Sequence, residues 1–217
     1  MMTEQEILLY YEQQDAIWFF NYKGDPKAPH AELTSGLCSD GYVNSAPVLA
    51  IPEVVETLAT ELVERLESRN IDTSHVGWVI GSAYAAITFS YEVAYQLGAR
   101  HGFVEKDSAN SKKMVWNRLA IPAGSLVLQC EELITTLDTT TEVRRAVEAG
   151  NPNPVSWLFD VATAIYRPAK LQGGRSHVIS LVAREVKTWE PDNCPLCARG
   201  SERLRPKQNW ARLTGKV

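Results

Sequence analysis

Short apolar runs alternate with helical patterns from residue 52 to residue 165, and this alternation constrains the fold more than any other feature of the sequence. Pro52 suits the first turn of a helix, and apolar residues recur on one face of that segment as far as Leu66. The alternation predicts an α/β fold, in which a central parallel sheet is covered by helices on both faces. Ligands of such sheets bind at the carboxyl ends of the strands. The runs expected to be strands are VGWVIG (76–81), HGFVEK (101–106) and SLVLQC (125–130).

The ends of the chain carry weaker signals. Apolar residues at helical spacing predict a helix over residues 4–20. Two short strands are expected around a turn at Cys38–Gly41, and two longer ones at 155–166 and 177–186.

Two helices inside the alternating region have recognisable ends. Residues 83–98 are typical of a turn followed by a helix that Gly98 stops. Asp138 or Thr139 can cap the next helix, and Thr139 with Glu142 has the spacing of a capping box. Gly150 is expected to close this helix.

Composition argues against two classes of partner. The chain has 217 residues and a formal net charge of −4, so it carries no global basic field for nucleic acid. The cations of residues 203–216 are few, and a solvated tail is expected there. No apolar run approaches the roughly 20 residues of a membrane-spanning helix, and the N-terminus lacks the pattern of a signal peptide. We therefore expect a cytoplasmic protein that binds neither nucleic acid nor membrane.

The stretch CEELITTLDTTTE (130–142) combines carboxylates with hydroxyls. Glu131 and Glu132 are expected at the end of a strand, and the N-terminus of a helix follows, where free N–H groups favour anions. Carboxylates accept hydrogen bonds from sugar hydroxyls or hold a divalent cation. A ligand with a phosphate and a ribose diol would suit this arrangement. A solvated, threonine-rich capping loop explains the same residues, so both interpretations stay open.

The chain has four cysteines, Cys38, Cys130, Cys194 and Cys197, and three of them lie in interpretable patterns. Cys130 lies in an apolar run and is expected to pack as a small hydrophobic residue. Cys194 and Cys197 form CPLC, which is half of a zinc site. A reduced structural turn is the simplest interpretation of CPLC, and zinc binding and redox chemistry are the alternatives. The two further zinc ligands would come from a second subunit or from His30, His75, His101 or His177.

Several stretches together resemble one enzyme family. Residues 127–140 resemble the phosphoribosyl-pyrophosphate signature of type I phosphoribosyltransferases, in which an apolar strand leads into two acidic residues and a threonine-containing phosphate loop. The order and spacing of the motifs make the resemblance specific from about residue 30 to residue 206. The other motifs resemble those of orotate phosphoribosyltransferases: LTSGLCSDGYVNS (33–45) their N-terminal segment, VIGSAYAAI (79–87) their pyrophosphate loop, FVEKDS (103–108) the strand before their catalytic loop, and CPLCARGSERLRP (194–206) the ending of one bacterial branch.

The resemblance implies a type I phosphoribosyltransferase fold in three parts. These are an N-terminal helix and hood segment (1–50), a phosphoribosyltransferase core (51–170), and a C-terminal strand, CPLC turn and tail (171–217). It implies transfer of ribose 5-phosphate from phosphoribosyl pyrophosphate to orotate in pyrimidine nucleotide synthesis, with Mg²⁺ bound to the diphosphate. It also implies a homodimer, because the family's mobile loop reaches the site of the neighbouring subunit.

The resemblance assigns roles to individual residues as well. Lys106, with Lys112 or Lys113 from the mobile loop, would meet the diphosphate, and Glu132 with Glu131 would hold the ribose hydroxyls. The remaining expected contacts are Ser82, Ala83 and Tyr84 for the pyrophosphate, Thr135, Thr136, Asp138, Thr139 and Thr140 for the 5′-phosphate loop, and Ser35, Gly36 and Ser39 for the wall of the base pocket.

The sequence departs from the family pattern in two loops. Leu137 and Asp138 stand where the phosphate loop of the family has glycine. Ser82, Ala85 and Ala86 stand where the pyrophosphate loop has proline and two glycines. The alternative hypothesis is therefore a homologue that kept the fold and acts as a binding or regulatory protein, without catalysis or with altered specificity.

Overall fold

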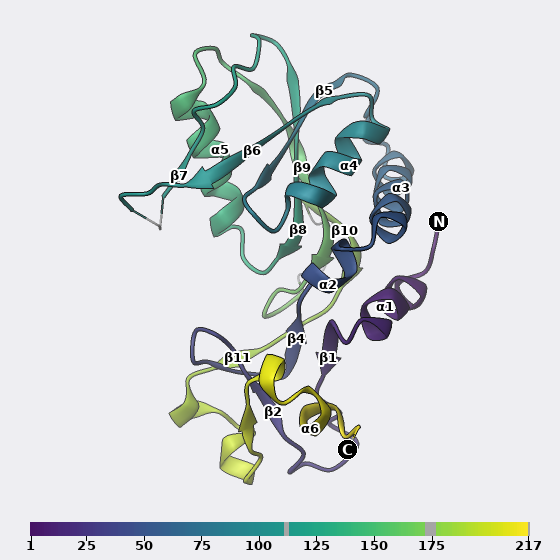
Figure 1. The fold of residues 1–217 in the computed structure, drawn as a ribbon, viewed down its shortest axis with the longest axis vertical. Coiled ribbons are helices and arrows are strands. Elements are labelled where there is room, and N and C mark those ends of the chain that lie inside the picture. The colour runs from purple at the N-terminus through teal and green to yellow at the C-terminus, as the bar shows by residue number, and fades with distance from the viewer. Residues whose placement is uncertain (111–112, 172–176, 217) are drawn as a thin grey trace.

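A six-stranded sheet is the centre of the computed structural model, which describes residues 1–110, 113–171 and 177–216 (Figure 1). The strand order is β10–β9–β8–β5–β6–β7, and neighbouring strands are parallel except for the antiparallel pair β6 and β7. β5 and β8 lie in the middle; β5 and the first part of β8 are mostly buried, which explains the apolar runs in these two segments. The strands are β5 (Val76–Ser82), β6 (Arg100–Lys106), β7 (Met114–Val115), β8 (Leu126–Ile134), β9 (Ser156–Tyr166) and β10 (Val178–Ala183).

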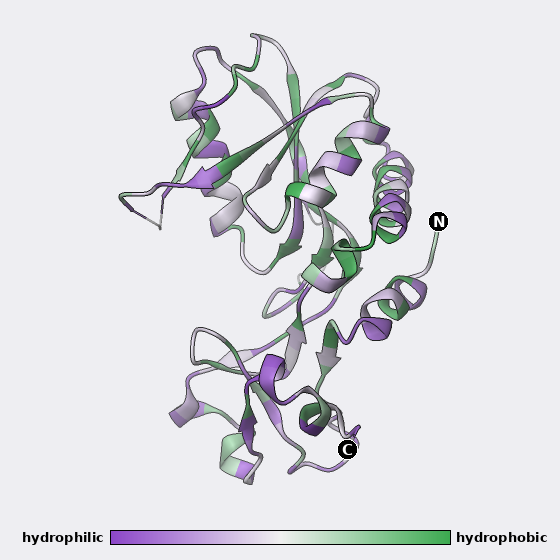
Figure 2. Cartoon of the chain, viewed as in Figure 1, coloured by the Kyte–Doolittle hydropathy of each residue, from purple (hydrophilic) through white to green (hydrophobic). Residues whose placement is uncertain are grey.

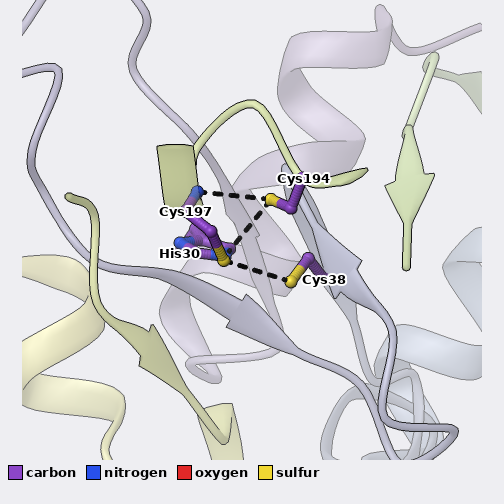
Figure 3. Close-up of side chains that lie close together, drawn as sticks. All are labelled: His30, Cys38, Cys194 and Cys197. Carbon is purple, nitrogen blue, oxygen red and sulfur yellow. Dashed lines mark hydrogen bonds between the residues drawn. The ribbon is translucent and has the colours of Figure 1, made fainter. Parts of the chain in front are cut away.

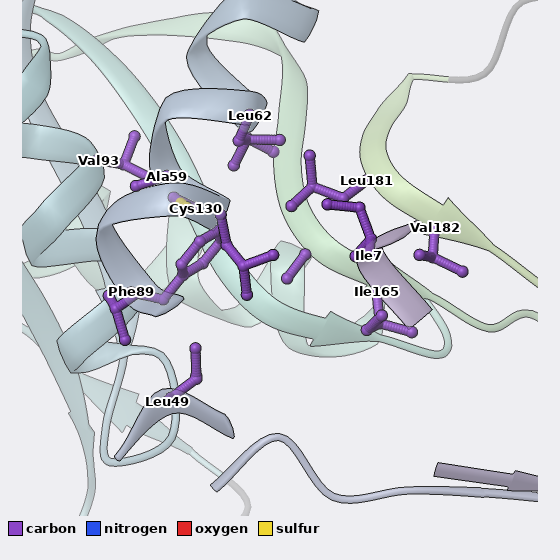
Figure 4. Close-up of a cluster of buried hydrophobic side chains, with 14 of the residues drawn as sticks. Ile7, Leu49, Ala59, Leu62, Phe89, Val93, Cys130, Ile165, Leu181 and Val182 are labelled. Carbon is purple, nitrogen blue, oxygen red and sulfur yellow. The ribbon is translucent and has the colours of Figure 1, made fainter. Parts of the chain in front are cut away.

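Helices cover both faces of this sheet, as the alternation predicted. The helices are α1 (Glu4–Gln13), α2 (Ala46–Leu49), α3 (Pro52–Ser68), α4 (Ile87–Gln96), α5 (Asp138–Gly150) and α6 (Trp210–Thr214). α1, α3 and α4 pack on one face and α5 on the other (Figure 1). Figure 4 shows the larger core, to which helices contribute Leu62 and Phe89 and a strand contributes Ile165. Cys130 is fully buried there, as predicted. The predicted α/β fold is confirmed.

A smaller four-stranded sheet joins the two ends of the chain. Its order is β11–β3–β2–β12, and it combines two N-terminal with two C-terminal strands. We call residues 17–43 and 188–214 the hood, which also contains the antiparallel pair β1 and β4. Figure 1 shows the hood at one end of the larger sheet. The strands are β1 (Ile17–Phe19), β2 (His30–Glu32), β3 (Cys38–Ser39), β4 (Gly41–Val43), β11 (Thr188–Trp189) and β12 (Arg203–Leu204).

Hydropathy differs between the two parts of the molecule. Figure 2 shows hydrophobic residues concentrated on the strands of the larger sheet and on the helix faces that cover it, whereas hydrophilic residues recur along the hood. No helix of the described residues is long and apolar enough to cross a membrane. The division of the chain at residues 50 and 170 stays a prediction.

The N-terminal region differs from its predicted structure. α1 ends at Gln13, and Asp15 adopts a left-handed conformation with a φ of 50°, which a helix cannot continue through. The prediction of a helix over residues 4–20 is therefore wrong in its second half, where residues 17–19 pair with β4. The predicted turn at Cys38–Gly41 is also wrong, because Cys38 and Ser39 form β3 and the turn lies before them, at Gly36 with a φ of 86°.

The start of α5 differs from the predicted capped start, whereas its end agrees with the prediction. The residue before the helix is Leu137, and no side chain caps the first turn, so capping by Asp138 or Thr139 is wrong. Glu142 does not close a capping box, because it accepts hydrogen bonds from the Met114 amide at 3.0 Å and from the Arg145 guanidinium at 2.6 and 2.7 Å. The last residue of the helix is Gly150, as predicted.

Candidate functional site

Segments from both parts of the chain meet at the carboxyl edge of the larger sheet. β5 ends at Ser82, β6 at Lys106 and β8 at Ile134. Because these strands are parallel, their carboxyl ends lie on one edge. The residues after β4, Asn44 and Ser45, line a cavity at the same edge. The fold therefore places a site where parallel sheets bind their ligands.

Two cavities open at this edge, and Tyr84 lines both of them. The first has a volume of about 520 Å³ and contains Glu132 with polar residues of the segment after β4. The second has a volume of about 540 Å³ and contains Lys106 and Asp107. The Tyr84 side chain is 85% exposed, so it stands at the surface between them. One extended ligand could thus contact a carboxylate in the first cavity and an ammonium group in the second.

Glu131 and Glu132 are neighbours in β8 and so point to opposite faces of the sheet. Glu131 is 2% exposed and accepts hydrogen bonds from Ser82 Oγ at 2.6 Å and from Gln129 Nε2 at 3.3 Å. Burial raises the pKa of Glu131 to about 7, although the hydrogen bonds from Ser82 and Gln129 act to lower it. Glu132 lines the first cavity, and burial raises its pKa too. Glu132 is therefore the carboxylate that a ligand can reach, and Glu131 is built into the protein beneath the site.

The loop after β5 was expected to present three backbone amides to a pyrophosphate. The Ala83 N–H donates to the Val104 carbonyl at 2.8 Å, so that amide is satisfied within the protein. The Ser82 hydroxyl is held by Glu131. Tyr84, whose peptide bond to Ala83 is cis, faces the two cavities. Of the three residues, Tyr84 therefore has the most open position for a ligand.

The threonine-rich loop leads from β8 into α5. Leu137 has a φ of −86°, so the backbone here does not adopt the left-handed conformation that would require glycine. The Leu137 side chain is 48% exposed, and the Asp138 carboxylate accepts a hydrogen bond from Thr136 Oγ1 at 3.0 Å. Thr140 Oγ1 is buried and has no hydrogen-bond partner among the described residues. Thr135 lies in the bend before α5 and Thr139 in the first turn of α5, near the positive end of the helix dipole.

The expected lysines lie on and after β6. The exposed Lys106 lines the second cavity. Lys113 is also exposed, and its carbonyl accepts the Asp107 N–H at 3.0 Å, which closes the loop between them. Lys112 lies outside the described residues. Glu105 is bound through two hydrogen bonds of 2.6 and 2.9 Å from Arg118, so its carboxylate is already neutralised beside Lys106.

The three residues expected to wall the base pocket lie in the hood and line neither cavity. Ser39 is fully buried, and its hydroxyl donates to the carbonyls of Gly41 and Lys187 at 2.8 and 3.1 Å, so it links the N-terminal part of the hood to the segment just before β11. Ser35 is exposed in the turn that Gly36 makes possible. The structure therefore does not bring Ser35, Gly36 and Ser39 together with Glu132.

Sequence reasoning missed several polar residues of the two cavities. Asn44, Ser45 and Thr88 line the first cavity, and Asp107 and Asn117 line the second. Asn44 and Ser45 follow directly after a strand, and that position could have marked them. Asn117 and Thr88 lie in segments whose patterns carry no such signal.

Comparison with known proteins gives sequence relatives over almost the whole chain. No family model matches it. The orotate phosphoribosyltransferase of Desulforamulus reducens is 34% identical over 196 residues, which are 89% of this chain and 96% of that protein. The orotate phosphoribosyltransferase of Pelotomaculum thermopropionicum is 32% identical, again over 196 residues, 89% of this chain and 96% of that protein.

Solved structures share the fold. The crystal structure of orotate phosphoribosyltransferase from Aeropyrum pernix matches 96% of this chain and 99% of its own, with a TM-score of 0.54 and 14% identity. That of adenine phosphoribosyltransferase from Rhodothermus marinus matches 82% of this chain and 99% of its own, with a TM-score of 0.51 and 22% identity. Because the sequence relatives exceed 30% identity over nearly the full length of both proteins, the chain belongs to the orotate phosphoribosyltransferase family.

Proposed function

We propose that the chain is an orotate phosphoribosyltransferase, which transfers ribose 5-phosphate from phosphoribosyl pyrophosphate to orotate in pyrimidine nucleotide synthesis. The observation that carries this proposal is the pair of cavities joined at Tyr84, with Glu132 in one and Lys106 in the other. The names of the sequence relatives support orotate as the acceptor. In this reaction the bond from ribose C1 to a pyrophosphate oxygen breaks, a bond from C1 to a ring nitrogen of orotate forms, and the proton of that nitrogen is released to the solvent.

The charges in the two cavities suit the charges of this reaction. Pyrophosphate leaves with concentrated negative charge, and the ammonium group of Lys106 can stabilise it as it departs. Positive charge develops on the ribose ring at the same time, and the carboxylate of Glu132 can stabilise that charge and accept hydrogen bonds from the ribose hydroxyls. Glu131 supports this arrangement from below by holding Ser82 at the end of β5.

The first turn of α5 is the proposed place of the 5′-phosphate. N–H groups at a helix start and the helix dipole both favour an anion. The buried, unpartnered hydroxyl of Thr140 among the described residues supports this placement, because buried hydroxyls normally have a partner. Leu137 adopts the backbone conformation of this turn without strain, since its φ is −86°. The negative charge of the Asp138 carboxylate repels the phosphate and weakens its binding.

We propose that Mg²⁺ enters this site bound to the diphosphate. Asp107 lines the second cavity beside Lys106 and offers carboxylate oxygens, which are ligands that magnesium prefers. The bound ion would neutralise part of the diphosphate charge. The chain's own contribution is to place Lys106 and Asp107 next to the leaving group.

A homodimer and a cytoplasmic location belong to the same proposal. Tyr91 and Tyr95 lie on one face of α4 and are 59% and 74% exposed, and Tyr84 precedes that helix with 85% of its surface exposed. Exposed aromatic groups of this kind support an interface with a second copy. The four cysteines form no disulfide, which is typical of proteins in a reducing compartment. Light scattering on the purified chain tests the dimer.

Paired substitutions of two glutamates test the proposed site. Glu132→Gln removes the accessible carboxylate of the first cavity, and Glu56→Gln makes the same change at an exposed position on α3. Orotate consumption is followed by its ultraviolet absorbance, with phosphoribosyl pyrophosphate and Mg²⁺ present. We expect kcat/KM to fall on the order of 100-fold for Glu132→Gln and to stay unchanged for Glu56→Gln. Equal activity of the two variants would contradict the assignment of Glu132.

A further inference from the structure

Four metal-ligating side chains from distant parts of the sequence converge inside the hood. His30 belongs to β2, Cys38 to β3, and Cys194 and Cys197 to the CPLC turn. Their ligand atoms all lie within 4.8 Å of one another (Figure 3). Three of the four residues are buried and Cys197 is partly buried. The cluster lies among hood residues and shares no residue with the two cavities at the sheet edge.

Three of the separations between these atoms match those of a tetrahedral zinc site. Zinc bonds of about 2.3 Å to sulfur and about 2.0 Å to nitrogen place tetrahedral ligands about 3.8 Å apart for two sulfurs and about 3.5 Å apart for sulfur and nitrogen. The Sγ atoms of Cys38 and Cys197 are 3.7 Å apart. His30 Nε2 lies 3.6 Å from Cys194 Sγ and 3.5 Å from Cys197 Sγ. A disulfide would bring two sulfurs to about 2.05 Å, so the cluster has the spacing of a coordination sphere and not of a disulfide.

Hydrogen bonds around the cluster orient the histidine for metal binding. The Ser201 hydroxyl donates to the Ala28 carbonyl at 2.6 Å, so toward His30 Nδ1, at 2.7 Å, it can only accept. The proton of a neutral His30 ring therefore lies on Nδ1, and the lone pair of Nε2 faces the sulfurs. Such a partner on the far nitrogen is the usual support of a zinc-binding histidine. The Cys197 N–H also points to Cys194 Sγ, at 3.5 Å.

The hood needs a cross-link more than the rest of the chain does. Its hydrophobic cluster has Phe20, Cys38, Cys194 and Leu196 as its buried members, so two of the four are themselves candidate ligands. The larger core in contrast draws on the four helices α1, α2, α3 and α4 and on strands of the larger sheet. Small units that cannot build a sufficient hydrophobic core are commonly stabilised by a structural metal.

We propose that His30, Cys38, Cys194 and Cys197 bind one Zn²⁺ in a closed structural site that fastens the C-terminal segment of the hood to its N-terminal strands. All four ligands come from the protein, which leaves no open position for catalysis. Three thiolates and one imidazole form a ligand set that suits zinc better than magnesium or calcium. Of the interpretations that CPLC allowed, the zinc site accounts for the convergence of His30 and Cys38, which a reduced turn does not require.

Metal analysis of the full chain tests this proposal. The chain is produced without a metal-binding tag in zinc-supplemented medium, and its metals are measured by mass spectrometry. We expect about one zinc per chain in the wild type and in Cys130→Ala, whose cysteine lies in the larger core, and less than a tenth of that in Cys38→Ser and Cys194→Ser. Iron in place of zinc, no metal in the wild type, or full zinc in both serine variants would overturn the proposal.

Cobalt binding by the wild-type chain keeps the test independent of variant folding. Zinc is removed with a chelator under reducing conditions, and the chain is titrated with Co²⁺. We expect saturation at about one equivalent, with the strong visible bands of tetrahedral cobalt and the near-ultraviolet band of thiolate-to-metal charge transfer, both lost when Zn²⁺ is added. Weak octahedral bands only, or a disulfide between Cys38 and Cys197 in the freshly purified chain, would overturn the site. Neither readout depends on phosphoribosyltransferase activity.

Discussion

The substitution Glu131→Gln tests whether the buried carboxyl of β8 holds a proton near neutral pH. Glu131 is 2% exposed, and Ser82 Oγ donates to it at 2.6 Å. Its pKa is about 7 in the folded chain, against 4.5 for an ordinary glutamate, because burial disfavours the charged form. Glutamine has nearly the same size and cannot ionise.

The magnitude follows from the difference between the folded and unfolded pKa. Because the folded value is the higher one, the folded state binds more protons between pH 4.5 and about 7, and stability falls as the pH rises through this window. At about 1.4 kcal/mol for each pKa unit, the full cost of Glu131 is on the order of 3 kcal/mol at pH 8. Part of it is already present at pH 5, so the change between pH 5 and pH 8 is on the order of 2 kcal/mol.

Urea unfolding at pH 5 and pH 8 measures this change. We expect Glu131→Gln to gain about 2 kcal/mol relative to the wild type between the two pH values, with Glu56→Gln on the surface of α3 as the control that shows no such gain. Burial also raises the pKa of Glu132, but Glu132 is present in all three proteins, so its contribution cancels in the comparison. A difference between wild type and Glu131→Gln that is the same at both pH values would refute a proton on Glu131.

Three further predictions concern single residues. Lys106→Ala should lower kcat/KM for phosphoribosyl pyrophosphate on the order of 100-fold. The control Lys23→Ala, at an exposed lysine of the hood, should leave kcat/KM unchanged. Equal kinetics of the two variants would contradict the assignment of Lys106 to the site. Asp138→Asn removes a repulsion on the order of 1 kcal/mol near 4 Å, so the KM for phosphoribosyl pyrophosphate should fall about fivefold, and an unchanged KM would place the phosphate elsewhere. Gly150→Ala sets a methyl group against the Trp116 carbonyl and should cost about 1–3 kcal/mol in urea unfolding; unchanged stability would contradict that packing.

The larger sheet could be predicted because its signals are local. Pro52 begins α3, Gly98 with a φ of 62° follows α4, and the apolar runs become the parallel strands. The N-terminal region could not be predicted in the same way. Phe19 keeps the helical spacing of the apolar residues before it, but Ile17 and Phe19 pair with Val43 and Gly41 of β4, and this contact is not encoded locally.

The motifs of the candidate site could be predicted from the sequence, but the burial of its individual side chains could not. The motif predicted two carboxylates at a strand end, but β8 continues through both, so Glu131 is buried and Glu132 faces a cavity. The partners of CPLC could not be singled out, for a different reason: His30 was one of four candidate histidines, and Cys38 was not a candidate. His30 and Cys38 lie more than 150 residues before it, and neither shows a recognisable ligand spacing with Cys194 or Cys197. Only the fold of the hood brings them together.

Orotate consumption by the purified wild-type chain tests the central claim most directly. Phosphoribosyl pyrophosphate, Mg²⁺ and orotate are supplied together and with each omitted in turn, and binding of phosphoribosyl pyrophosphate is measured by calorimetry on the same preparation. The proposed function predicts that orotate disappears only when both substrates and Mg²⁺ are present, with one pyrophosphate released for each orotate consumed. Binding of phosphoribosyl pyrophosphate without any loss of orotate would contradict it and would identify the chain as a binding or regulatory member of the family.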